Sequence, residues 1–98
     1  MSNILPSGTG WICDPGHAWL CVPLDGPSGD WYAKKMAKAI ATASRFSWVA
    51  RGKCRQQHFA MLEEDCDAPA FITACALSPD EVRALPEHQV EHVKRPWD

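Results

Sequence analysis

Long apolar runs are missing from this 98-residue chain, which has no stretch near the roughly 18 apolar residues of a membrane-spanning helix. Its first residues, MSNILPSGTGW, lack the basic segment and apolar core of a secretion signal. We therefore expect a cytoplasmic protein with no membrane partner. Five cysteines are an odd number, so we expect buried thiols that pack as small hydrophobes instead of a disulfide framework.

Catalytic signatures are few. His88, Glu91 and His92 have the His-x-x-Glu-His spacing of an inverted zincin motif, but the flanking residues are polar and predict a solvated tail without a pocket. The sequence contains no glycine-rich phosphate loop and no serine or cysteine in the setting of a nucleophile elbow. It has no Cys-x2-Cys pair, the usual source of ligands for structural zinc. We therefore expect no enzymatic activity, no cofactor and no metal. A small metal-binding protein remains an alternative, and its candidate ligands are Cys13, His17, Cys21, Cys54, His58 and Cys66.

The chain has the size and composition of one globular domain. Apolar residues make up 46% of it and charged residues 22%, which is typical of a folded protein. Pro6, Gly8 and Gly10 predict a flexible N-terminal arm over residues 1–10. We expect a single domain over residues 11–86 and a polar C-terminal tail over 87–98, which could be a short helix, an edge strand or disordered.

The pattern of apolar residues predicts two hairpins, each followed by a helix. Residues 11–23 form the first hairpin around Asp14-Pro15-Gly16, a sequence typical of turns. Alternation directs Leu20 and Val22 toward the core and Trp19 toward the opposite face. The second hairpin begins at Arg45 and turns at Arg51-Gly52-Lys53.

Three helices are indicated by their capping residues. Asp30 or Ser28 begins a helix whose inward stripe is Tyr32, Met36, Ile40 and Ala43. Asp67 begins a short helix with Pro69 in its first turn. Ser78, Pro79 and Glu81 form a capping box for a third. The expected fold is α+β, ββα-ββα, an antiparallel sheet with helices packed on one face.

Charge is segregated along the chain, although the net charge is only −2. Residues 1–32 hold three acids and no base, and residues 33–58 hold seven bases and no acid. Residues 59–98 hold nine acids against three bases. Such blocks matter for binding only if folding keeps them apart, because otherwise they form surface ion pairs of little energetic value.

The basic block supports one alternative function, a nucleic-acid-binding accessory protein. Lysines on one side of the predicted helix are compatible with phosphate contacts. The acidic composition of the whole chain argues against this alternative. Its contact residues would be Lys34, Lys35, Lys38, Arg51 and Arg55.

Two motifs, DPGHAWLCVP (residues 14–23) and LEEDCDA (residues 62–68), carry a family resemblance. Together they resemble a family of small phage- and plasmid-encoded proteins of proteobacteria. Ala18 stands where that family usually has glycine, and Met61 where it usually has an aromatic residue. The resemblance covers about residues 13–72 and implies no activity, because the family has none assigned.

The resemblance favours a mobile-element protein that acts by binding a protein of its bacterial host. Anti-CRISPR inhibitors are one such class, and some block a basic DNA groove with clustered carboxylates. We therefore expect an inhibitor of a CRISPR–Cas complex that works through an acidic surface. The expected contact residues are Glu63, Glu64, Asp65 and Asp67, with Trp19 as an apolar anchor.

Overall fold

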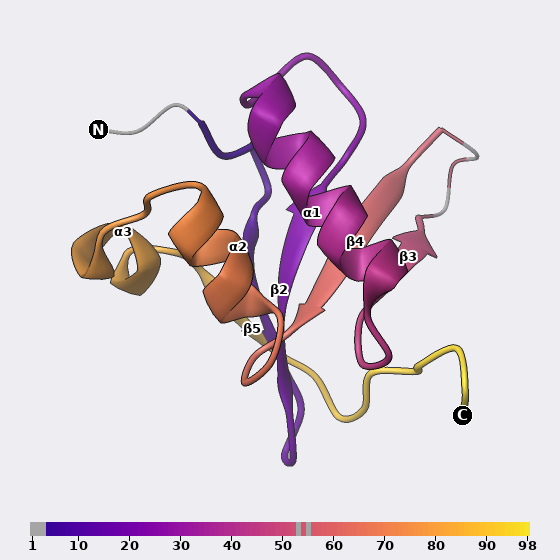
Figure 1. The fold of residues 1–98 in the computed structure, drawn as a ribbon. Helices are drawn as coiled ribbons and strands as arrows, with labels where there is room; N and C mark the ends of the chain where they lie inside the picture. The colour runs from indigo at the N-terminus through magenta and orange to yellow at the C-terminus, as the bar shows by residue number, and fades with distance from the viewer. Residues whose placement is uncertain (1–3, 53, 55) are drawn as a thin grey trace.

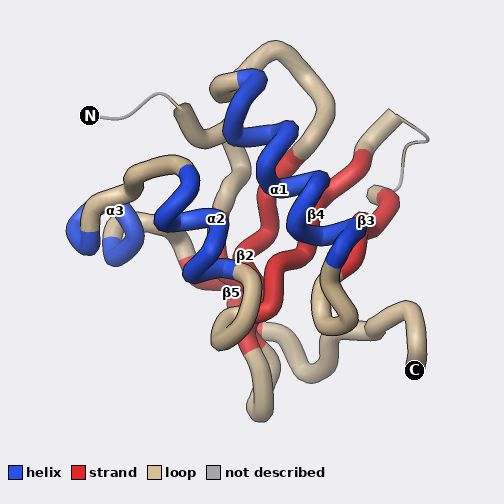
Figure 2. Tube along the Cα trace, viewed as in Figure 1, coloured by secondary structure: helices blue, strands red, loops and turns tan. Residues whose placement is uncertain are grey.

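The computed structural model describes residues 4–52, 54 and 56–98 and confirms the α+β class (Figure 1). Five strands form one sheet in the order β3-β4-β2-β1-β5. The strands are β1 (Gly10–Cys13), β2 (Ala18–Pro23), β3 (Trp48–Arg51), β4 (His58–Glu63) and β5 (Glu87–Gln89). The helices are α1 (Trp31–Ala43), α2 (Ala68–Ala74) and α3 (Pro79–Arg83), and α1 and α2 lie over the same face of the sheet (Figure 2).

Both predicted hairpins are present in the sheet. In the first, the Asp14 carboxylate accepts hydrogen bonds from the backbone N–H groups of Gly16 and His17, which closes the turn between β1 and β2. In the second, β3 pairs antiparallel with β4, and the predicted turn includes Lys53, which lies outside the described residues. The sheet is mixed and not fully antiparallel, because β5 runs parallel to β1.

The helix-facing side of the sheet carries the main core. Leu20, Val22 and Leu62 are fully buried there against α1 and Phe71 of α2. The residues of α1 that face the sheet are Ala33, Ala37 and Ala41. The predicted inward stripe of α1 was therefore wrong, because the buried residues lie one position after Tyr32, Met36 and Ile40. Tyr32 is 45% exposed, and Met36 and Ile40 lie at the margins of the core. Alanines allow the helix backbone to approach the sheet closely, and larger side chains flank the contact.

The opposite side of the sheet is covered by the C-terminal segment. Val93 packs against Trp19 and Met61, and its backbone N–H donates to Asp14 at 3.3 Å. The rings of Trp48 and Trp97 are nearly perpendicular, with 5.5 Å between their centroids. Of the three alternatives for residues 87–98, the edge strand is present over Glu87–Gln89, and Val93 packs on the sheet beyond the expected boundary at residue 86.

The N-terminal segment is also packed, from Ile4 onward. Ile4 and Leu5 contact the main core, and the backbone N–H of Asp30 donates to the carbonyl of Ile4 at 2.7 Å. Gly29 has a φ of +82°, and a Cβ there would overlap the backbone of Pro6. Residues 4–10 are therefore part of the domain and do not form the expected arm; the remainder of that arm, residues 1–3, lies outside the described residues.

Two of the three predicted helix starts have the expected cap hydrogen bonds. The side chain of Asp30 accepts from the backbone N–H of Tyr32, and the Ser78–Glu81 capping box is complete. Asp67 occupies the N-cap position of α2, but its side chain makes no hydrogen bond to that helix. The Asp67 carboxylate is used elsewhere, in the site that follows.

Candidate functional site

Strands β2 and β4 bring the two sequence motifs together. Trp19 of the first motif lies directly opposite Glu63 of the second in the antiparallel register. The backbone N–H of Glu64 donates to the carbonyl of Ala18 at 3.1 Å. Segments more than 40 residues apart in sequence therefore meet at one end of the sheet. We call residues 63–67, which leave β4 and lead into α2, the acidic turn.

The acidic turn presents two of its four carboxylates to solvent. Glu64 and Asp65 are exposed. Glu63 is half-buried, and one of its carboxylate oxygens accepts from the backbone N–H groups of Asp65 at 3.0 Å and Cys66 at 2.8 Å. Glu63 therefore shapes the turn, and Glu64 and Asp65 carry its accessible negative charge.

Asp67 points inward, which corrects its expected role as a contact residue. Its carboxylate accepts hydrogen bonds from the hydroxyl groups of Ser44 and Ser47, in the loop after α1. The Ser47 hydroxyl also accepts from the backbone N–H of Glu63 at 2.9 Å. Asp67 therefore ties the acidic turn to this loop, and the loop places Phe46 beside the turn.

Trp19 cannot serve as an exposed anchor, because it is only 1% exposed. Among the described residues, its indole N–H is the one buried side-chain donor without a hydrogen-bond partner. Phe46 and Trp97 are instead 50% and 52% exposed. They flank an open hollow of about 290 Å³, the acidic hollow, whose lining residues are His17, Trp19, Phe46, Glu63, Asp65, Cys66, Arg95 and Trp97.

The one arginine that lines the acidic hollow is already paired. Arg95 bonds the Asp98 carboxylate at 3.0 to 3.2 Å, and these hydrogen bonds are the main reason that the pKa of Asp98 falls to about 2. The charge of Arg95 is therefore compensated by Asp98 and leaves Glu64 and Asp65 available.

The carboxylates of the acidic turn raise the pKa of the Cys66 thiol. A hydrogen bond to the Glu63 carboxylate is the largest cause that raises the pKa of the exposed Cys66 thiol, and the charges of Glu63, Asp67 and Asp65 add to it. A raised thiol pKa leaves less thiolate, the reactive form, at neutral pH. Exposure alone therefore does not make Cys66 a good nucleophile.

We expect Glu63→Gln to speed the alkylation of Cys66 at neutral pH, because it removes a negative charge beside the thiolate. The rate is measured with iodoacetamide by peptide mass spectrometry, in a Cys54→Ser background that removes the other exposed thiol. Glu87→Gln, at a distant exposed position, is the control and should leave the rate unchanged. A rate that does not respond to Glu63→Gln would show that the turn has a different geometry.

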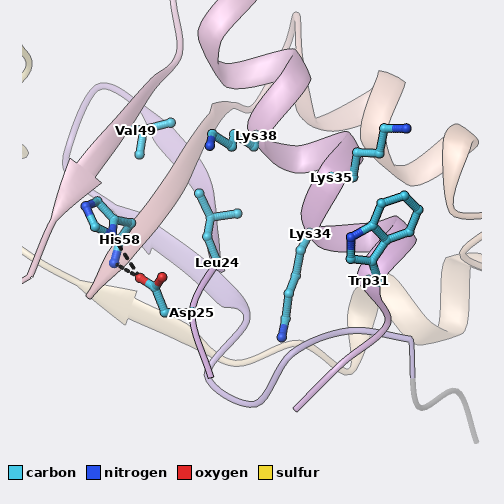
Figure 3. Close-up of a pocket in the computed structure, with 8 residues that line it drawn as sticks. All are labelled: Leu24, Asp25, Trp31, Lys34, Lys35, Lys38, Val49 and His58. Carbon is cyan, nitrogen blue, oxygen red and sulfur yellow. Dashed lines mark hydrogen bonds and ion pairs between the residues drawn. The ribbon is translucent and has the colours of Figure 1, made fainter. Parts of the chain in front are cut away.

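Only some of the basic residues predicted to contact nucleic acid lie together in the structure. Lys34, Lys35 and Lys38 line a second hollow (Figure 3). It includes His58, which begins β4, whereas the acidic turn follows the other end of that strand. Arg51 is exposed at the end of β3 and is not among the lining residues. Arg55 lies outside the described residues. The three lysines of α1 and the acidic turn therefore lie at opposite ends of β4, whereas Arg45 of the basic block lies in the loop that Asp67 ties to the acidic turn.

The cysteines do not all behave as buried hydrophobes. Cys75 is buried and Cys13 and Cys21 are partly buried, but Cys54 and Cys66 are exposed. The last two lie in loops, where no core is available to cover them. Within residues 4–52, 54 and 56–98, no three histidine, cysteine or carboxylate side chains are placed to hold a metal ion.

No helix in the described part of the chain combines the length and apolarity needed to cross a membrane. Comparison with protein-family models, with curated protein sequences and with solved structures gave no match. Inference about function therefore depends on the residues of this chain and their arrangement.

Proposed function

We propose that this protein acts without catalysis, by binding a positively charged macromolecule through the acidic turn and the aromatic residues beside it. The observation that carries the proposal is one hollow that Asp65 lines together with two half-exposed aromatic side chains, Phe46 and Trp97. The exposed Glu64 adds a second negative charge next to Asp65 in the acidic turn. Protein interfaces commonly combine aromatic anchors with a charged rim. The carboxylates attract a basic partner, and the aromatic rings supply apolar contact area.

The fold supports the accessibility of this surface. The two inward carboxylates, Glu63 and Asp67, hold the turn and the neighbouring loop in place. Phe46 and Trp97 are therefore presented by a structured loop and by a packed C-terminal segment. A surface held in its binding conformation loses less conformational entropy when a partner binds.

The proposed partner is a bacterial host complex with a basic groove, such as a CRISPR–Cas effector. Such grooves are lined by lysine and arginine because they hold nucleic acid. The support for this particular target is the resemblance to mobile-element proteins. The support for a basic partner is the acidic turn itself.

Purified CRISPR–Cas effectors of several types provide the test of this target. Excess wild-type protein should slow target-DNA cleavage by one of them, and Glu64→Lys/Asp65→Lys should weaken the inhibition at least tenfold, since like charges at an interface cost several kcal/mol. The control Asp80→Lys/Glu87→Lys makes the same change in net charge at exposed positions on α3 and β5, and should still inhibit. Full activity of every effector would overturn this target.

A further inference from the structure

The basic hollow lies between α1 and the strands, at the end of β4 away from the acidic turn. It is open to solvent and has a volume of about 530 Å³. Leu24 and Val49 give it an apolar floor, and both are half-buried. The remaining lining residues are Asp25, Trp31, Lys34, Lys35, Lys38 and His58 (Figure 3).

The hollow carries an excess of positive charge. Its lining residues include three lysines of α1 and one carboxylate, that of Asp25. That carboxylate is occupied, since it accepts from the backbone N–H of His58 and lies 3.0 Å from the Nδ1 atom of the same residue. It is therefore held beside His58, which leaves the lysines to attract an anion.

Trp31 stands at the rim of the hollow and is 71% exposed. The Nζ atom of Lys35 lies 4.9 Å from the centroid of the Trp31 ring, a cation–π distance. An exposed indole beside several lysines is the combination that single-stranded nucleic acids bind, with a base stacked on the ring and phosphates on the ammonium groups. A duplex keeps its bases stacked inside and offers no free base face to Trp31.

We propose that the basic hollow binds single-stranded nucleic acid, with a base on Trp31 and phosphates on Lys35 and Lys38. Lys34 contributes charge, although its Nζ atom also donates to the carbonyl of Gly26. This activity is separate from the proposed function. The six residues of β4 span about 17 Å between His58 and Glu63, so both surfaces can be occupied at once.

Fluorescence anisotropy with a labelled oligothymidine of about 12 nucleotides tests this site. We expect binding at low salt, with log K falling against log salt with a slope of about −2 if three phosphates are neutralised. Trp31→Ala should weaken binding at least about fivefold through lost stacking, and Lys35→Glu/Lys38→Glu at least about tenfold through charge repulsion. All three side chains are exposed, so thermal unfolding should change little.

The matched control is Arg83→Glu/Lys94→Glu, which makes the same change in net charge at exposed positions outside the hollow. It should leave binding close to wild type. No binding at low salt, an equal loss in this control, or equal affinity for a duplex of the same length would each overturn the proposal. None of these results would change the effect that Glu64→Lys/Asp65→Lys is expected to have on inhibition through the acidic turn. The two proposals can therefore be disproved independently.

Discussion

Trp19→Ala is expected to lower the free energy of unfolding by about 3–5 kcal/mol, the usual loss for a large aromatic residue in a core. Trp19 is buried between the sheet and the C-terminal segment, with the Trp48 ring 5.8 Å away and His17 at 5.4 Å between centroids. Its removal would leave a cavity beneath Val93 and also loosen the segment that carries Trp97. Urea denaturation followed by far-ultraviolet circular dichroism measures the change.

Two variants separate packing at Trp19 from other effects. Trp19→Phe should cost only roughly 1–2 kcal/mol, because a ring remains in place and the indole N–H has no partner within the described residues. Trp31→Ala makes the same substitution at an exposed position and should cost less than about 0.5 kcal/mol. Equal losses at Trp19 and Trp31 would contradict the burial of Trp19.

Asp67→Ala is expected to lower the free energy of unfolding by about 2–3 kcal/mol, because it leaves two hydroxyl groups without their charged acceptor. The loop that carries Phe46 would then lose its link to the acidic turn. Asp65→Ala, two residues earlier on the exposed side of the turn, should cost less than about 0.5 kcal/mol. Both changes are measured by urea denaturation at neutral pH.

Asp67→Asn refines this comparison. Both hydroxyl groups bond the same oxygen of Asp67, and an amide oxygen can still accept from them but carries no charge. The loss should therefore fall between the wild type and Asp67→Ala. If Asp65→Ala destabilised the protein as much as Asp67→Ala, the assignment of one carboxylate to structure and the other to the surface would be wrong.

Local signals predicted most of the fold. The Asp14-Pro15-Gly16 turn, the Asp30 cap and the capping box at Ser78 each depend on residues a few positions apart. The inward stripe of α1 was wrong because apolar residues occur on more than one side of that helix. Ala33, Ala37 and Ala41 face the sheet because α1 packs close to it. The distance between a helix and a sheet depends on tertiary packing and cannot be derived from the periodicity of apolar residues.

The site was predicted only in part, because its contacts join distant segments. The exposure of Glu64 and Asp65 follows from the density of carboxylates around them. The inward turn of Asp67 depends on serines before β3, and the burial of Trp19 depends on Val93, near the other end of the chain. The sequence predicts a strand at Phe46 and a polar tail at Trp97, and neither prediction indicates an aromatic anchor.

Photo-crosslinking from position 46 tests the central claim most directly, that the acidic turn and its aromatic neighbours form the contact surface. Phe46→benzoylphenylalanine, in protein produced in bacterial cells, should crosslink to a partner protein. The crosslink should disappear with Glu64→Lys/Asp65→Lys and persist with Asp80→Lys/Glu87→Lys. The same probe at Tyr32, an exposed aromatic position on α1, should not capture that partner. A crosslink that survives reversal of the acidic turn, or one that forms from position 32 and not from 46, would contradict the claim.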